Sequence, residues 1–312
     1  MELGAHLPLI DFGDGGRSLT DLVTYAREAE ALGLTFLCAN DHLVYSRPWL
    51  DGPTALAAAV EASGEMTLAT TVALPVVRGP VQVAKTLATL DRLSGGRIVA
   101  GVGPGSSVRD FVSVGVPFEE RWQRLDEAIG ALRALWNPAA PAFAGRFYST
   151  DGIVVEPRPV RETGPPIWIG SWGSAAGLRR VARLGDGWLA SGYNATPTSL
   201  RERLDRLARE LVSAGREPKA FPNGIATMWL YVTESGRAAN AMLADVLSPM
   251  LDRPLEELRR VSLPIGAPAR CAEILSEYAA AGAQRVFVWP LADDVRQLRL
   301  LRERVVPLLG GA

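Results

Sequence analysis

Short apolar segments that are typical of β-strands alternate with segments of helical periodicity along the whole chain of 312 residues. The expected strands are residues 2–9, 36–39, 66–73, 98–102, 166–170, 187–190, 225–232 and 285–289. Helical periodicity covers residues 19–31, 81–93, 121–136, 200–214, 269–281 and 295–308. Eight such units predict an α/β protein built as a parallel (β/α)8 TIM barrel. A doubly wound open sheet is the alternative, but closure is favoured because no linker divides the units into two domains.

Two stretches interrupt the alternation. Residues 138–165 are rich in proline and follow the fourth helix of the barrel, so we expect an insertion there that contains a small hairpin. Residues 238–264 contain short helical pieces and form a second expected insertion after the seventh strand. The sequence shows no internal repeat, and we interpret residues 1–312 as a single domain.

Composition argues against several classes of function. The net charge is −1, which provides no electrostatic basis for binding nucleic acid or a membrane surface. The apolar runs are too short to span a bilayer, and the first residues do not resemble a signal peptide. Two histidines and two cysteines (Cys38 and Cys271) form no metal-binding spacing, so we expect no metal site. These observations favour a soluble protein of the reducing cytoplasm.

In a TIM barrel, chemistry is expected in the loops at the carboxyl ends of the strands. His42 lies directly after the second expected strand, beside Asp41. An imidazole at this position can transfer a proton or hydrogen-bond to a carbonyl, although a loop histidine can also cap a helix or simply pack. His6 lies within the first strand, and we interpret it as a hydrogen-bonded core residue.

Residues 165–190 contain a strand, the small-residue loop Gly170, Ser171, Trp172, Gly173, Ser174, and then a helix start. Backbone N–H groups and the positive end of the helix dipole favour a phosphate at such a site. An ordinary turn between a strand and a helix is the alternative interpretation. Arg179 and Arg180 lie in the early turns of the same helix. The earlier stretch GVGPG, residues 101–105, is a poor dinucleotide fingerprint but suits close backbone approach to a flat or anionic ligand.

Several stretches together resemble the luciferase-like flavin or deazaflavin oxidoreductases across nearly the whole chain. They are the triplet Asn40-Asp41-His42, the triplet Thr70-Thr71-Val72, residues 85–105, residues 170–188 and residues 266–290. The resemblance implies a (β/α)8 barrel with an isoalloxazine-type ring in its mouth. It also implies a non-prolyl cis peptide at Thr71–Val72 that supports the ring.

By the same resemblance, the cofactor phosphate is held by the loops after the fourth and fifth strands. The implied cofactor-binding residues are Gly103, Pro104, Gly105, Ser106, Gly170, Ser171, Trp172, Gly173 and Ser174, with Arg179 or Arg180 as the charge partner. His42, with Asp41 beside it, matches the family's histidine for proton transfer or substrate orientation. One departure is that sugar-phosphate dehydrogenases of this family carry a glutamate where this chain has Pro104-Gly105-Ser106, which argues against that particular substrate.

We therefore expect an oxidoreductase that uses the deazaflavin coenzyme F420 for hydride transfer to or from a small organic substrate. A reduced-FMN-dependent monooxygenase is the main alternative, and a flavin-binding barrel without catalysis is a third. The Asp41–His42 pair and the preference for arginine over lysine favour the deazaflavin. Relatives are often homodimers. Aromatic residues that either line the substrate pocket or belong to the core are Trp49, Phe111, Trp122, Trp172, Tyr193 and Trp229.

Overall fold

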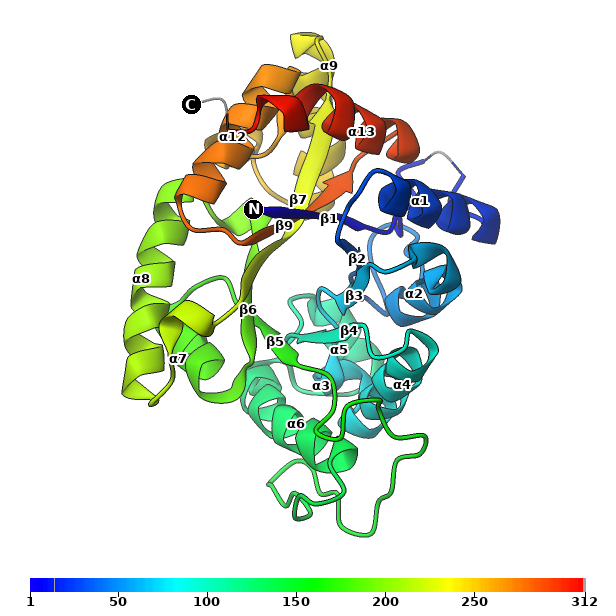
Figure 1. Cartoon of the computed structure of the whole chain (residues 1–312), viewed down its shortest axis with the longest axis vertical. Helices are drawn as coiled ribbons and strands as arrows, with labels where there is room; N and C mark the ends of the chain where they lie inside the picture. Colours follow the sequence, from blue (N-terminus) through cyan, green and yellow to red (C-terminus); the bar gives the residue numbers. More distant parts are fainter. Residues whose placement is uncertain (14, 311–312) are drawn as a thin grey trace.

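The computed structural model describes residues 1–13 and 15–310 and forms a closed barrel of parallel strands (Figure 1). The barrel strands are β1 (Glu2–His6), β2 (Phe36–Ala39), β3 (Thr67–Thr70), β4 (Ile98–Val102), β5 (Ile167–Gly170), β6 (Gly187–Ser191), β7 (Asn223–Val232) and β9 (Arg285–Pro290). They pair in sequence order from β1 to β7, and β9 closes the ring between β7 and β1. The predicted TIM barrel is confirmed.

Helices surround the barrel (Figure 1). Buried side chains of these helices and of the strands form the main hydrophobic core. The longer ones are α1 (Leu19–Ala31), α2 (Gly52–Ala59), α4 (Pro80–Leu93), α6 (Arg121–Trp136), α7 (Ala175–Leu184), α8 (Pro197–Ser213), α12 (Pro268–Ala280) and α13 (Asp294–Leu300). Short helices α3 (Pro75–Arg78) and α5 (Val108–Ser113) follow β3 and β4. Ser18 starts α1 with a capping box, and Gly33 follows its end with a φ of 74°, which glycine adopts without steric cost.

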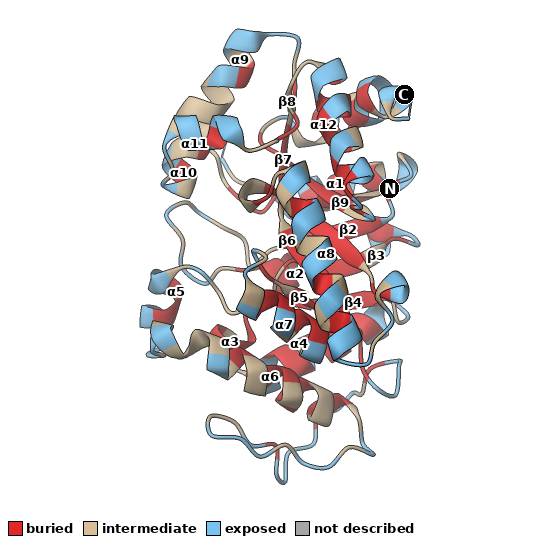
Figure 2. Cartoon of the chain, turned by 90° about the vertical axis from the view of Figure 1, so that its left-hand side faces the viewer, coloured by how far each residue is buried: buried red, intermediate tan, exposed pale blue. Residues whose placement is uncertain are grey.

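The inside of the barrel is filled by side chains that alternate with those facing the helices. Phe36, Val99, Trp168, Leu189 and Phe287 form this inner cluster with smaller neighbours, and all are buried. Buried residues therefore run along every barrel strand, as Figure 2 shows in red. The tightly filled interior leaves the carboxyl-terminal mouth as the place for a ligand.

Several element bounds differ from the sequence expectation. β1 ends at His6 rather than Leu9, and β3 ends at Thr70 rather than Ala73. The Thr71–Val72 peptide bond, just beyond the end of β3, is cis, and Ala73 still forms a parallel bridge with Val102. The expected helix over residues 295–308 is interrupted, since α13 continues as a π-helix (Leu301–Val305) and a 3₁₀ turn (Val306–Leu308).

The two excursions from the barrel have different structures. Residues 137–166 contain no helix or strand, and an antiparallel bridge between Ala144 and Ser149 is what corresponds to the expected hairpin. After β7 the chain forms α9 (Gly236–Ala241), a π-helix (Met242–Leu247), α10 (Ser248–Leu251), α11 (Leu255–Arg260) and the two-residue strand β8 (Ile265–Gly266). Figure 2 shows α10 and α11 at the same end of the barrel as α5. None of the helices in the described residues has the length and apolar character needed to cross a membrane.

Candidate active site

A cavity of about 410 Å³ opens at the carboxyl ends of the strands. It is lined by residues that follow β2, β3, β4, β5 and β6 and by Ala226 and Thr227 within β7, so the barrel brings together segments that are far apart in sequence. The sequence-predicted site residues in this lining are Asp41, His42, Thr71, Val72, Gly103, Pro104, Gly105, Ser106, Gly170, Ser171, Trp172 and Ser174.

Gly173 and Arg179 were also predicted, but they do not line the cavity. Gly173 has a φ of 88° and forms the turn beside it, where its N–H donates to Ser171 Oγ at 3.2 Å. Arg179 is exposed, because the buried face of α7 carries its neighbours Leu178 and Ala182 and directs Arg179 outward. Arg180, the other arginine considered, forms an ion pair with Asp126. Neither of the two arginines of α7 that the sequence suggested lines the cavity.

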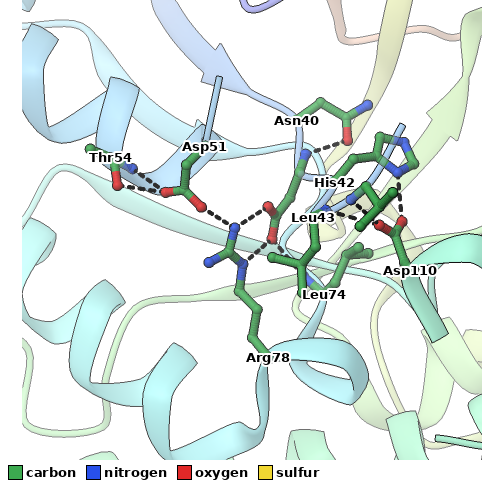
Figure 3. Close-up of polar contacts among 10 residues, drawn as sticks. Asn40, His42, Leu43, Asp51, Thr54, Leu74, Arg78 and Asp110 are labelled. Carbon is green, nitrogen blue, oxygen red and sulfur yellow. Dashed lines mark hydrogen bonds and ion pairs between the residues drawn. The ribbon is translucent and has the colours of Figure 1, made fainter. Parts of the chain in front are cut away.

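His42 pairs with Asp110, a residue that the sequence analysis did not single out (Figure 3). The distance from His42 Nδ1 to Asp110 Oδ2 is 2.7 Å, and the Asp110 side chain is fully buried. The other carboxylate oxygen, Oδ1, accepts hydrogen bonds from the N–H groups of Leu43 at 2.9 Å and Val44 at 2.8 Å. Asp110 thereby holds both the histidine ring and the loop that carries it.

The ionisation of Asp110 determines which nitrogen of His42 carries a proton. Burial alone raises the pKa of Asp110, but the hydrogen bonds from His42, Val44 and Leu43 outweigh burial and hold the pKa below its ordinary value. An ionised carboxylate only accepts hydrogen bonds, so His42 Nδ1 donates to it. Nε2 has no hydrogen-bond partner among the described residues. That nitrogen is free to take a proton from a ligand or to give one.

Asp41 was predicted to act with His42, but the structure gives it a different partner. Arg78 donates to both of its oxygens, at 2.7 Å to Oδ2 and 2.6 Å to Oδ1, and Leu74 N donates to Oδ2 at 3.3 Å. Arg78 also pairs with Asp51, the residue that caps α2. The Asp41 carboxylate is thus buried and occupied. It ties the loop after β2 to α3, and the acid beside His42 is Asp110.

The Thr71–Val72 peptide bond is cis, as the family resemblance implies. The Val72 side chain lies against two glycines of the neighbouring loops. A Cβ on Gly103 would lie 2.5 Å from Val72 Cγ2, and one on Gly170 would lie 2.9 Å from Val72 Cγ1. Only glycine allows the backbone at the ends of β4 and β5 to come this close to the segment with the cis peptide bond. Together with Leu189 and Ala226, Val72 forms an apolar wall in the cavity.

Hydrogen-bond donors collect on the β5 side of the cavity. Ser174 caps α7 by accepting from Gly177 N at 3.1 Å, and it lines the cavity. The first N–H groups of a helix have no partner within it, so the start of α7 offers donors and a positive dipole end. An apolar wall beside such a group of donors fits a cofactor that has a planar ring and a phosphate.

His6 lies beneath the cavity, where the sequence analysis expected a core histidine. It is fully buried and stacks on Trp289 with a centroid distance of 4.5 Å. β7 contains a bulge at this level, and Thr227, with a φ of 57°, donates its N–H to His6 Nε2 at 3.0 Å. Burial lowers the pKa of His6 from 6.5 to about 3. His6 is therefore a neutral hydrogen-bond acceptor that holds the backbone of β7 beneath the cavity.

The aromatic candidates divide between the site and the core. Trp122, Trp172 and Tyr193 line the cavity, whereas Phe111 and Trp229 are buried in the core. Trp49 packs edge-on against the His42 ring at 4.7 Å. Within residues 1–13 and 15–310, no group of three His, Cys, Asp or Glu side chains is arranged to hold a metal ion.

Comparison with known proteins identifies the family. Residues 9–285 match the model of the luciferase-like monooxygenase family. The chain belongs to this family. It is 30% identical to an F420-dependent glucose-6-phosphate dehydrogenase of Kribbella flavida, over 93% of this chain and 94% of that one. It is also 30% identical to an F420-dependent hydroxymycolic acid dehydrogenase of Mycobacterium tuberculosis, over 63% of this chain and 55% of that one.

Solved structures support the same fold. An F420-dependent secondary alcohol dehydrogenase in complex with an F420–acetone adduct superposes with a TM-score of 0.85 at 18% identity, covering 98% of each chain. The monooxygenase RslO1 from Streptomyces bottropensis superposes with a TM-score of 0.81 at 22% identity, covering 98% of this chain and 99% of that one. The fold is therefore shared by deazaflavin-dependent dehydrogenases and by monooxygenases.

Proposed function

We propose that this chain is an oxidoreductase that uses coenzyme F420 for hydride transfer to or from a small organic substrate. The observation that carries the proposal is the His42–Asp110 pair, which lies in the same cavity as the Val72 wall and the donor-rich start of α7. F420-dependent relatives that match almost the full length of the chain support this choice of cofactor. A reduced-FMN-dependent monooxygenase is the second candidate, because the family model is described as luciferase-like monooxygenase and monooxygenases share the fold.

We assign the cofactor ring to the apolar wall formed by Val72, Leu189 and Ala226, beside the cis peptide. We assign its phosphate to the loops at residues 103–106 and 170–174, where glycine backbones and Ser174 approach the cavity. When bound, a deazaflavin supplies or accepts hydride at C5 and reacts poorly with oxygen. The protein then has to orient the substrate, exclude water and move one proton.

His42 is the residue that we assign to the proton. Nδ1–H is held by the Asp110 carboxylate, so the neutral ring presents Nε2 as a base and the protonated ring presents it as an acid. In the direction of oxidation, His42 Nε2 takes the proton of a substrate hydroxyl group as the hydride leaves its carbon. In the direction of reduction, the same nitrogen returns a proton to the oxygen. Asp110 is a positioning residue, and it also stabilises the positive charge on the ring.

Where sugar-phosphate dehydrogenases of the family carry a glutamate, this chain has Pro104-Gly105-Ser106. Arg121 is the only arginine or lysine among the described residues that line the cavity. We therefore do not extend the glucose-6-phosphate activity of the relatives to this chain. Homodimer formation in the cytoplasm belongs to the same proposal, and light scattering should give twice the chain mass of 33.4 kDa.

The proposal is tested by titrating the purified protein with F420 and with FMN while following cofactor fluorescence. We expect saturable binding of F420 that is at least about tenfold tighter than binding of FMN, which corresponds to about 1.4 kcal/mol. Tight binding of FMN without a response to F420 would contradict the proposal and favour the monooxygenase.

A further inference from the structure

Arg121 places a positive charge in the cavity that no acidic group neutralises. It lines the cavity together with Trp122, Ser106 and Ser174. Among the described residues, Arg121 takes part in none of the ion pairs within 4.0 Å. The acidic residue before it, Glu120, is already paired with Arg124 at 2.7 Å.

The other charged groups near the cavity have partners. Asp41 is paired with Arg78, Asp110 with His42, and Arg180, which lies over Trp122 at 4.7 Å, with Asp126. Among the described residues, Arg121 is therefore the cation of the cavity lining without an ion-pair partner, and it lies beside Ser106 and Ser174 of the loops that follow β4 and β5. A partly enclosed positive charge of this kind attracts an anionic ligand group.

The Arg121 side chain is fixed in position. Arg121 is the first residue of α6 and directly follows Glu120, the N-cap residue of that helix. Its guanidinium lies 3.9 Å from the centre of the Phe118 ring, and Nη1 donates to Phe118 O at 2.9 Å. The fold therefore holds this positive charge at the cavity instead of leaving it mobile in solvent.

We infer that Arg121 binds the anionic, phosphate-bearing chain of the cofactor, in place of the arginine of α7 that the sequence suggested. This inference rests on the proposed function, because that function places the phosphate between the β4 and β5 loops. The starts of α6 and α7 then act on one anion, with Arg121 contributing the charge and Ser174 and the first N–H groups of α7 contributing neutral donors.

The test compares two ligands that differ only in the anionic chain. Arg121→Gln is titrated with F420 and with the same deazaflavin whose side chain ends in a hydroxyl group instead of the phosphate. We expect the variant to lose at least about tenfold in affinity for F420, or about 1.4 kcal/mol. Its affinity for the ligand without phosphate should change by less than about twofold. Binding of F420 to the wild type should also weaken with salt more steeply than binding to the variant.

Two further variants provide comparisons. Arg183→Gln changes a mostly exposed arginine of α7 and should bind both ligands like the wild type. Arg179→Gln tests the residue that the sequence suggested. The inference is overturned if Arg121→Gln binds F420 like the wild type, if it loses affinity for both ligands equally, or if Arg179→Gln causes the selective loss instead.

Failure of the proposed function is distinguishable from failure of this inference. If the wild type binds neither deazaflavin but binds FMN, the proposed function fails, and Arg121 is then tested with FMN against riboflavin, which also differ by a phosphate. A selective loss of FMN affinity in Arg121→Gln would support the assignment of the anion site. An equal loss for both flavins, or no loss, would overturn it.

Discussion

Acidification should destabilise the protein through His6, the buried histidine beneath the cavity. Its Nε2 accepts a hydrogen bond from the N–H of Thr227 at 3.0 Å. A proton on Nε2 would face this N–H group and break the hydrogen bond. The buried imidazolium would also have no carboxylate partner among the described residues. The pKa of His6 is about 3 in the folded protein, against 6.5 as its ordinary value. Between these two pH values the unfolded chain binds more protons than the folded one, so stability rises with pH.

The size of the effect follows from the two pKa values. At pH 5 the unfolded histidine is almost fully protonated and the folded one almost fully neutral. The free energy of unfolding should therefore fall by about 2 kcal/mol between pH 8 and pH 5. Most of this loss occurs over the roughly 1.5 pH units below the ordinary pKa of histidine, at about 1.4 kcal/mol for each unit. His6→Gln preserves an acceptor for Thr227 N and removes the titrating group, so this part of the loss should disappear in the variant.

The assay is urea unfolding of both proteins at pH 8 and pH 5, followed by circular dichroism. Other groups titrate in both proteins and cancel when the two pH-dependent losses are subtracted, provided that the m-values agree. The wild type should lose about 2 kcal/mol more than His6→Gln. Equal losses in the two proteins would refute the interpretation of His6 as a buried neutral acceptor.

Three further predictions concern the site. His42→Ala should lower kcat by about 10²-fold or more while F420 affinity changes by less than about threefold, and an unchanged kcat would exclude the proton-transfer role. Asp110→Asn presents an amide donor to His42 Nδ1 and so favours the wrong tautomer, and steady-state kinetics should show kcat reduced at least about tenfold with little change in KM. Gly103→Ala forces a Cβ to within 2.5 Å of Val72 Cγ2 and should cost about 1–3 kcal/mol in urea unfolding. Gly236→Ala, whose Cβ would meet nothing within 4 Å, is the matched control, and equal stability of the two variants would contradict the packing argument.

The sequence predicted the barrel well because its signal is local and repeated. Each strand is a short apolar run, and each helix shows its own periodicity and caps, so the order of elements was readable without knowing any contact. The cis bond at Thr71–Val72 followed from the family resemblance and is present. The loops that line the cavity were also expected, because barrel topology brings the carboxyl ends of the strands together.

The sequence did not predict which charged side chains of the site pair with one another. Asp41 is adjacent to His42 in sequence, yet its side chain is directed to Arg78, and the carboxylate on His42 comes from Asp110, 68 positions away. Likewise, Arg179 follows the loop at residues 170–174 in sequence but is exposed and does not line the cavity, while Arg121 lines the cavity from another helix. Side-chain direction depends on helix phase and on tertiary packing, which sequence spacing alone does not determine.

The central claim is that this site transfers a hydride with F420 and a proton with His42. Its most direct test is incubation of the protein, without oxygen, with reduced F420 deuterated at C5 and a panel of small ketones and enones, followed by mass spectrometry of the products. We expect deuterium on carbon in the product, and we expect the His42→Ala variant to form this product much more slowly. Products that form only with reduced FMN and dioxygen, and that contain added oxygen instead of deuterium, would contradict it.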